Sequence, residues 1–359
     1  MSDLGQLVSA MTASRQIDLP RFLRVVEGHD ALDVQLRDVI DELEISAPLF
    51  VSGTSQSAAV CADLTGVNGN RVTVENNTRA TVARLAERLG RDHDAAIAVG
   101  GGRPIDVTKA ACLLADVPVI VIPTQLSTDG ISSPIAVIEE ADGSVVSERS
   151  QLPVAVIADL QTLAGAPPAF ARAGVGDLIS NRSALADWRL AAVYSDEKVD
   201  DFAALLSTCA HLLIEGLDLS GLRDGRVSIE LARRLLDGLV LSGLAMEIAG
   251  SSRPCSGSEH LISHALDRLE PGTASHGEQV AFGTIVATAL RGGDVDRARE
   301  MVASAGMTAA VAGFGIAPAR LAEIVKCAPG TRPGRFTILD HEPLSTRELR
   351  AELSALLDR

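Results

Sequence analysis

Several residue types and patterns are scarce in this chain of 359 residues. Aromatic side chains make up 3 % of it, too few for the aromatic platforms on which nucleic-acid bases stack. The 47 acidic residues exceed the 32 basic ones by 15, so we expect no broad surface for nucleic acid or anionic lipid. There is no run of 18 apolar residues, so we expect no insertion into a membrane.

The five cysteines form neither a disulfide framework nor a zinc knuckle. They are odd in number, widely spaced and without a Cys-x-x-Cys pair, which is typical of a reducing compartment. The first twenty residues carry an early acidic residue and lack a basic stretch followed by an apolar run, so they make a poor signal peptide. We therefore expect a cytoplasmic protein.

The first 160 residues alternate short apolar runs with helical patterns. This alternation, with short connections, predicts a parallel sheet that has helices on its faces. The apolar runs that we expect to be strands lie at 47–51, 71–74, 95–99, 117–122, 135–138 and 154–157.

From about Pro167 onward the period becomes almost wholly helical, as in SIELARRLLDGLVLSGLAMEIAG. The segment GAPP at 165–168 breaks both the period and the composition. We therefore expect an α/β domain over residues 1–165 and an all-α domain over residues 166–359. A cleft between two such domains is a usual place for a ligand.

Three glycines, Gly100 to Gly102, follow the expected strand at 95–99 and open a helix with Pro104 near its first turn. Glycines let a backbone approach closely, and free N–H groups at a helix start favour a diphosphate. The segment is not the usual G-x-G-x-x-G fingerprint, and an ordinary turn with Asp106 complementing the helix dipole explains it equally well. For Lys109 we favour the solvated face of this helix over a contact with ligand charge.

A polar segment, PTQLSTDGISSP at 123–134, follows the next expected strand. It brings hydroxyl groups, the Asp129 carboxylate and a glycine to the carboxyl end of the sheet, where open α/β folds bind ligands. Asp-Gly and Ser-Pro are also common turn sequences. Taken by itself, the segment is better explained as an ordinary turn.

Potential metal ligands gather in the second half. His260 and His264 are four residues apart and share a helical face, and His276 follows 16 residues after His260. With Asp177, two imidazoles and a carboxylate with an open fourth position suit a catalytic zinc or iron ion. A single histidine is more often a surface or core residue, but three of the chain's seven within 17 residues favour a site.

Five segments stand in the order in which they occur in sn-glycerol-1-phosphate dehydrogenases: GGGRPID, PTQLSTDGISSP, GVGDLISNRSALADWRLA, SSRPCSGSEHLISHALD and HGEQVAFGTI. Over roughly residues 45–290 the chain therefore resembles this family. The family belongs to the superfamily of metal-dependent alcohol dehydrogenases, glycerol dehydrogenases and 3-dehydroquinate synthases. The resemblance implies a dehydroquinate synthase-like fold, with an N-terminal Rossmann-like domain, a C-terminal all-α domain and a zinc ion in the cleft.

Position by position, the resemblance implies three groups of site residues. Asp177, His260 and His276 would bind the metal, which we expect to be zinc, with iron or nickel as alternatives. Asp129, Asp177 and His264 would contact the substrate, and His264 and Asp129 are the catalytic candidates. The residues implied in binding NAD or NADP are Gly101, Gly102, Arg103, Pro104, Ile105, Asp106, Thr124, Ser127 and Ser133.

The implied reaction is hydride transfer between the nicotinamide and a carbon that bears oxygen, with zinc as the Lewis acid. We expect His264 to relay the proton, because imidazole titrates near neutral pH. The substrate would be a small phosphorylated ketone or aldehyde, first of all glycerone phosphate, whose alcohol is sn-glycerol 1-phosphate. Arg253 and Arg182 are candidates to hold the phosphate, although each fits a surface arginine equally well. A homo-oligomer is the default for such an enzyme.

Two positions depart from the family pattern: Thr128 stands where His is common, and Arg182 where Tyr is usual. They leave room for another phosphorylated or hydroxylated ketone or aldehyde as substrate. The main alternative is a sugar-phosphate cyclase resembling 3-dehydroquinate synthase, in which the metal carboxylate is typically Glu and a lysine follows two glycines in the strand-end loop. Asp177 and TDGISSP favour the dehydrogenase. A protein that binds a nucleotide without catalysis is disfavoured, since all three metal-ligand positions are kept.

Overall fold

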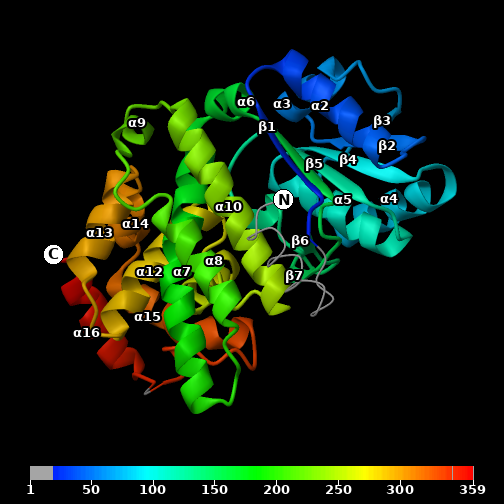
Figure 1. The fold of residues 1–359 in the computed structure, drawn as a ribbon. Coiled ribbons are helices and arrows are strands. Elements are labelled where there is room, and N and C mark those ends of the chain that lie inside the picture. The colour runs from blue at the N-terminus through cyan, green and yellow to red at the C-terminus, as the bar shows by residue number, and fades with distance from the viewer. Residues whose placement is uncertain (1–18, 342, 359) are drawn as a thin grey trace. The chain divides into compact units, whose positions relative to one another are not determined.

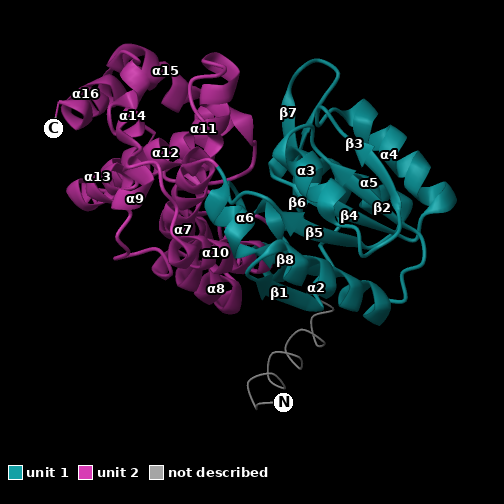
Figure 2. Ribbon diagram, turned by 90° about the horizontal axis from the view of Figure 1, so that it is seen from above, with its two compact units in different colours: residues 1–166, 246–250 teal, residues 167–245, 251–359 magenta. Residues whose placement is uncertain are grey.

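The computed structural model describes residues 19–341 and 343–358 (Figure 1). The chain divides into two compact units (Figure 2). One holds the described residues up to 166 together with 246–250, and the other holds 167–245 with the described residues from 251 onward. The first contains a parallel sheet with helices and the second is helical, which confirms the predicted fold class.

A six-stranded parallel sheet forms the centre of the first unit, with the order β1-β8-β5-β4-β2-β3. All residues of the central strands β8, β5, β4 and β2 are buried, as expected of parallel strands that have both faces covered. The strands are β1 (Phe22–Val26), β2 (Pro48–Ser52), β3 (Asn70–Thr73), β4 (Ala95–Gly100), β5 (Val119–Pro123) and β8 (Ala155–Asp159).

The helices α2 to α5 connect successive strands of the sheet, and α6 follows its last strand, β8 (Figure 1). α4 shows why they form: Thr78 caps its N-terminus, and Val82, Leu85 and Leu89 bury one face at helical spacing. The helices are α2 (His29–Glu42), α3 (Gln56–Asp63), α4 (Arg79–Asp92), α5 (Gly102–Ala115) and α6 (Leu160–Gly165).

The sheet differs from the prediction in two respects. The strand β1 was not predicted, and it pairs in parallel with β8 at one edge of the sheet. The residues expected at 135–138 form β6 (Ile135–Glu139), but this strand pairs antiparallel with β7 (Val145–Arg149) in a separate two-stranded sheet. The reason is a local turn through Asp142-Gly143, where Gly143 has a φ of +81° and lets the chain fold back on itself.

The strand order reverses between β2 and β4, because β3 follows on one side of β2 and β4 returns to its other side. In open α/β sheets, ligands bind outside the carboxyl ends of the strands at such a reversal. The loops after these two strands meet, since a Cβ added to Gly53 or to Gly100 would contact both Ser57 and Pro104. The fold therefore brings the predicted glycine segment to the expected ligand edge.

The second unit is built from helices around α12, which is buried on nearly all sides. Among the described residues there are three short 3₁₀ helices: η1 (Asp129–Ile131) in the first unit, and η2 (Gly313–Gly315) and η3 (Ala328–Thr331) in the second. The α-helices are α7 (Pro168–Tyr194), α8 (Asp201–Leu212), α9 (Ser220–Arg223), α10 (Ile229–Ala249), α11 (Ser258–Leu269), α12 (His276–Leu290), α13 (Val295–Ser304), α14 (Thr308–Val311), α15 (Pro318–Cys327) and α16 (Thr346–Leu357).

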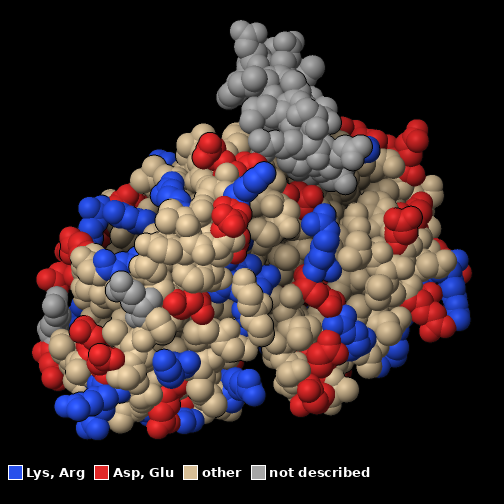
Figure 3. Space-filling model, turned by 90° about the horizontal axis from the view of Figure 1, so that it is seen from below, with Lys and Arg blue, Asp and Glu red and all other residues tan. Residues whose placement is uncertain are grey.

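The structure also bears on the expected charge distribution and on membrane insertion. On the face drawn in Figure 3, basic and acidic side chains are interspersed rather than gathered by sign. Among the described residues, no helix combines the length and the apolar character that crossing a bilayer requires.

The helices α7 and α12 cross with their backbones in contact. A Cβ added to Gly277 would lie closer than 3.0 Å to the backbone of Ala173, and one added to Gly176 would lie equally close to the carbonyl of Gly277. Only glycine permits so close an approach. The crossing lies next to two predicted metal ligands, since Asp177 follows Gly176 and His276 precedes Gly277.

We expect Gly277→Ala to lower the free energy of unfolding by about 3 kcal/mol, because the added methyl group meets backbone atoms that cannot move aside without separating two helices. Urea denaturation of the metal-free protein measures this change. Gly90→Ala is the matched control: Gly90 is exposed in α4 with nothing near its missing Cβ, so the same substitution should be neutral or stabilising. Equal stability of the two variants would contradict the close crossing.

Candidate active site

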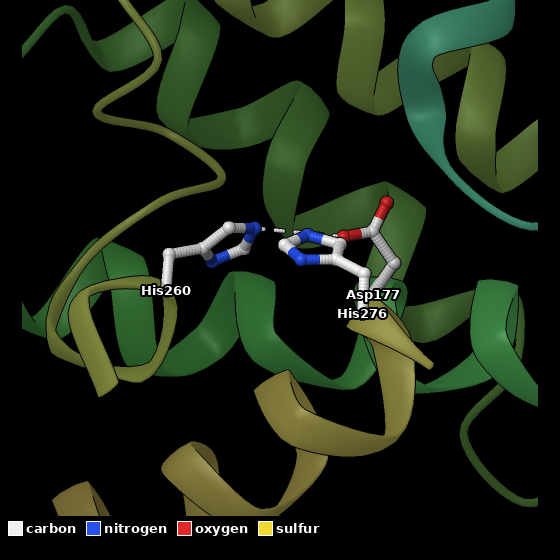
Figure 4. Close-up of side chains that lie close together, drawn as sticks. All are labelled: Asp177, His260 and His276. Carbon is white, nitrogen blue, oxygen red and sulfur yellow. Dashed lines mark ion pairs between the residues drawn. The ribbon is translucent and has the colours of Figure 1, made fainter. Parts of the chain in front are cut away.

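Asp177 from α7, His260 from α11 and His276 from α12 point toward one another (Figure 4). One potential ligand atom from each lies within 4.8 Å of the others, and His260 Nε2 is 3.6 Å from Asp177 Oδ1. Metal bonds of roughly 2.1 Å at tetrahedral angles place two ligand atoms roughly 3.4 Å apart. The three side chains therefore fit a single divalent cation, which leaves a fourth position open.

Glu259 fixes the orientation of the His260 ring. Its side chain is fully buried, and its Oε1 lies 3.1 Å from His260 Nδ1. The same carboxylate accepts the N–H of Gly257 at 2.5 Å and the hydroxyl of Ser183 at 2.9 Å. Because an ionised carboxylate can only accept, His260 Nδ1 carries a proton and Nε2 is the nitrogen that faces Asp177.

A chain of hydrogen bonds behind His276 sets its tautomer. Gln279 Nε2 donates to Asp267 Oδ1 at 2.8 Å and to the carbonyl of Ala274 at 3.3 Å, so Gln279 Oε1 faces Ser263. Ser263 donates its one hydroxyl proton to that oxygen at 2.7 Å, and it must therefore accept the proton of His276 Nδ1, which is 3.2 Å away. His276 Nε2 is left with the lone pair that a metal ligand needs.

The charges at this centre favour a cation. Burial alone would lower the pKa of His260, but hydrogen bonds with Asp177 and Glu259, together with their charges, raise it to about 9. Burial and the charge of His260 lower the pKa of His276. The two carboxylates thus stabilise one positive charge between the rings, and a divalent cation held by neutral imidazoles would take the place of that proton.

His264 lies one turn after His260 on α11, with its ring centroid 6.5 Å from that of His276. Burial lowers its pKa, and the charges of His276, His260 and two arginines lower it further, to about 3. This pKa lies below the neutral range on which the expected proton relay by His264 relies. Its neutral ring at pH 7 keeps one hydrogen-bond donor and one acceptor. Its contact with a substrate stays a prediction.

The glycine segment opens α5 at the carboxyl end of β4. Gly101 is the N-cap residue, and no side chain caps this end of the helix. A Cβ added to Gly102 would meet nothing within 4 Å. Arg103 is exposed, whereas residues 104–106 are buried. Uncapped N–H groups beside open space suit a diphosphate, so the segment fits a dinucleotide, although its binding by residues 101–106 stays a prediction.

The loop after β5 carries the other predicted cofactor and substrate residues of the first unit. Thr124 and Ser133 are buried, whereas Ser127 and Asp129 are partly exposed. The N–H of Thr124 donates to the carbonyl of Gly100 at 2.9 Å, which ties the start of the loop to the glycine segment. The contacts of these four residues with cofactor or substrate stay predictions. Asp129 belongs to the first unit, whereas Asp177, His260 and His276 belong to the second.

Lys109 is buried against this loop and donates hydrogen bonds to it. The expectation that its side chain lies on the solvated face of α5 is therefore wrong. Its side chain is fully buried, and Nζ donates to the carbonyls of Gly130 at 2.7 Å, Ser133 at 2.9 Å and Ile135 at 2.6 Å. Asp106 Oδ1 lies 3.9 Å from Nζ. Burial lowers the pKa of Lys109 to about 8 and raises that of Asp106 to about 6, with each charge opposing the shift of the other.

The two arginines suggested for a phosphate lie in different surroundings. Arg182 is exposed on α7, as the surface alternative allowed. Arg253 is buried, but its guanidinium already pairs with the carboxylate of Glu197 and donates to the carbonyl of Phe336 at 2.8 Å. The structure therefore gives neither of them the features of a phosphate site.

The sequence analysis missed the residues that support the converging histidines. A signal was present for Ser263 and Gln279, since each lies three positions after a histidine of the centre and so on the same helical face. No such signal marks Glu259. Its complete burial depends on the contact of its backbone with Gly283 of α12, which only the fold reveals.

Comparison with known proteins identifies relatives of the whole chain. Residues 28–167 match the family described as iron-containing alcohol dehydrogenase. The chain is 37 % identical over 356 residues to a glycerol-1-phosphate dehydrogenase (NAD(P)+) of Methanosarcina mazei, covering 96 % of this chain and 98 % of that protein. It is 35 % identical over 349 residues to the protein of that name from Methanothermobacter thermautotrophicus, covering 96 % and 99 %.

Solved structures share the fold. A probable glycerol dehydrogenase from Sinorhizobium meliloti matches with a TM-score of 0.76 and 21 % identity, over 94 % of this chain and 97 % of that one. The glycerol dehydrogenase of Schizosaccharomyces pombe matches with a TM-score of 0.74 and 17 % identity, over 95 % and 90 %. At these identities the likeness concerns the fold alone, and it agrees with the fold predicted from the sequence.

We expect Gln279→Leu to weaken binding of Zn²⁺ or Co²⁺ by 10- to 100-fold, roughly the usual loss when a partner of a ligand histidine is removed. Without the Gln279 oxygen, the Ser263 hydroxyl is free to donate to His276 Nδ1, which moves the ring proton to Nε2. Chelator competition with the metal-free protein measures the affinity.

The matched control is Thr284→Val, which changes a buried polar residue of the same helix whose hydroxyl donates only to the Val280 carbonyl. It should leave metal affinity within about 2-fold, because it has no bond to a ligand side chain. Unchanged affinity in Gln279→Leu would show that the hydrogen-bond chain does not set the tautomer of His276.

Proposed function

Because the chain belongs to the family of glycerol-1-phosphate dehydrogenases, we propose that it is a metal-dependent, NAD(P)-linked oxidoreductase that interconverts glycerone phosphate and sn-glycerol 1-phosphate. The observation that carries the metal-dependent part is the convergence of Asp177, His260 and His276. The names of the relatives support the substrate and the cofactor.

The three converging side chains would hold the metal. A carboxylate and two imidazoles leave a fourth tetrahedral position for the oxygen of the substrate. When bound, the metal would supply Lewis-acid chemistry at that oxygen. Zinc is the metal we propose, and iron or nickel suit the same donors.

The chain's own residues would orient the reactants. Glu259 and Ser263 hold the ligand rings with Nε2 free. The neutral ring of His264 would accept the proton of a substrate hydroxyl on its unprotonated nitrogen and release the proton of its other nitrogen to water. Asp129 would contact the substrate. The nicotinamide cofactor would lie along the ends of β4 and β5, against residues 101–106 and the hydroxyls of Thr124, Ser127 and Ser133.

The two departures from the family pattern leave the donor set unchanged. Arg182 is exposed on α7. Thr128 caps η1, with its hydroxyl accepting the N–H of Gly130 at 3.2 Å. Relatives of 35 to 37 % identity named as glycerol-1-phosphate dehydrogenases favour this reaction over the sugar-phosphate cyclase.

A cytoplasmic location and a homo-oligomeric state complete the proposal. All five cysteines are free, which suits a reducing compartment. Most soluble oligomers are homo-oligomers with closed symmetry.

We expect the metal-loaded protein to oxidise NADH or NADPH in step with the reduction of glycerone phosphate. Loss of nicotinamide absorbance, followed with each cofactor in turn, measures the reaction. A sugar-phosphate cyclase would instead turn over its own substrate with no steady change in that absorbance. Absence of glycerone phosphate reduction with both cofactors would refute the proposed substrate.

We expect His260→Ala to lose bound metal and to reduce turnover by about 1,000-fold or more, since Lewis-acid stabilisation is worth several kcal/mol. Nicotinamide binding should persist, because the predicted cofactor residues belong to the other unit. Metal analysis and cofactor fluorescence check the two parts separately. His93→Ala, which removes a histidine that lies 3.1 Å from the Ala47 carbonyl, should keep the metal. Full metal content in His260→Ala would remove His260 from the ligand set.

A further inference from the structure

Two guanidinium groups of the helical unit meet at one hydroxyl group. Arg332 Nη1 and Arg335 Nη2 each donate to Ser252 Oγ at 2.9 Å. Both arginines follow η3, and Ser252 lies in the turn between α10 and α11, next to Arg253. Segments about 80 residues apart in the sequence thus bring three arginines together.

The charge of this cluster is only partly balanced. Arg253 pairs with Glu197, but within the described residues neither Arg332 nor Arg335 has a carboxylate oxygen within 4.0 Å. Arg335 is only 8 % exposed. Burial, and next the charges of Arg332 and Arg253, lower the pKa of Arg335 to about 9. The charges of Glu259 and Glu197 offset that of Arg335 only in part. A buried cation that is incompletely balanced is costly, so an anion bound at this place would be favoured.

The cluster is linked to the metal centre through a short series of bonds. Arg335 Nη1 donates to the carbonyl of Ser256. The next residue, Gly257, donates its N–H to Glu259 Oε1 at 2.5 Å, and the same oxygen lies 3.1 Å from His260 Nδ1. The guanidinium of Arg335 is therefore held to the same turn that orients a metal ligand.

His264 lies within electrostatic reach of the cluster. The positive charges of Arg332 and Arg335 both contribute to its low pKa, after burial and the two neighbouring histidines. Arg332 and His264 are each partly exposed, whereas Arg335 is buried. The partly exposed guanidinium of Arg332 therefore gives an anion from solvent access to the cluster.

We infer that Arg332 and Arg335 form the subsite that binds the phosphate group of the substrate. The inference rests on the proposed function and adds to it the residues that would hold the charged end of a phosphomonoester dianion. Guanidinium groups suit this task because their forked N–H groups match phosphate oxygens in pairs. Their shared bond to Ser252 holds the two forks together. Arg253 is not part of this subsite, since Glu197 neutralises its charge.

The test compares Arg332→Met with the unchanged protein, both loaded with zinc. We expect the variant to lose about 100-fold in kcat/KM for glycerone phosphate, the loss that corresponds to one or two charge-assisted hydrogen bonds. Inhibition by inorganic phosphate should weaken by a similar factor. For glycerone, which lacks the phosphate, kcat/KM should stay within about 3-fold, and metal content should be unchanged.

Two further variants complete the design. Arg335→Lys keeps the buried charge but loses the fork, so it should fold and lose about 10-fold for glycerone phosphate. Arg234→Met, which removes an exposed arginine of α10, should match the unchanged protein with every ligand.

The outcomes separate the two hypotheses. If the unchanged protein reduces glycerone phosphate but Arg332→Met loses equally with glycerone, or keeps its inhibition by phosphate, the subsite is refuted and the function stands. If the unchanged protein reduces neither compound with either cofactor, the proposed function itself is refuted. Weakened phosphate inhibition together with an unchanged rate for glycerone supports the subsite.

Discussion

The convergence of Asp177, His260 and His276 depends on helices that approach without side chains between them. Gly176 and Gly277 let α7 and α12 touch, and Gly283 lets α12 lie against the backbone of Glu259 in α11. Asp177 and His276 are direct neighbours of the first two glycines in the sequence. The helix crossing therefore also fixes the backbone positions of these two residues. A wider crossing would separate the donor atoms by more than a metal ion can span.

Within that frame, hydrogen bonds decide what the donors can do. Glu259 holds the proton of His260 on Nδ1, and the chain from Ser263 to Gln279 and Asp267 does the same for His276. Both rings thus keep Nε2 for a cation. Three hydrogen-bond partners offset the desolvation of the buried Glu259 carboxylate: the Gly257 N–H, the Ser183 hydroxyl and the His260 ring. The supporting residues are therefore as necessary to the site as the ligands they orient.

The sequence predicts those parts of the molecule that periodicity and clustering encode. Alternating apolar runs indicate the parallel sheet, and the clustering of His260, His264 and His276 indicates the centre. Properties that depend on what packs against a residue are not encoded in this way. Lys109 carries a charge at a position that looks solvated, yet the loop after β5 folds over it and supplies three carbonyl acceptors. The separate pairing of β6 likewise depends on the turn at Gly143 and on a partner strand whose own pattern is weak.

The charge balance of the buried arginines is likewise not encoded in the local sequence. Sequence position and charge single out Arg253, but its charge is already met by Glu197, which is 56 residues away. The unbalanced charge lies on Arg332 and Arg335, which no motif marks. Because these two positive charges also act on the ring of His264, they help to keep that ring neutral until a dianion offsets them. A phosphate bound there would offset these two contributions, which are smaller than those of burial and of the two neighbouring histidines.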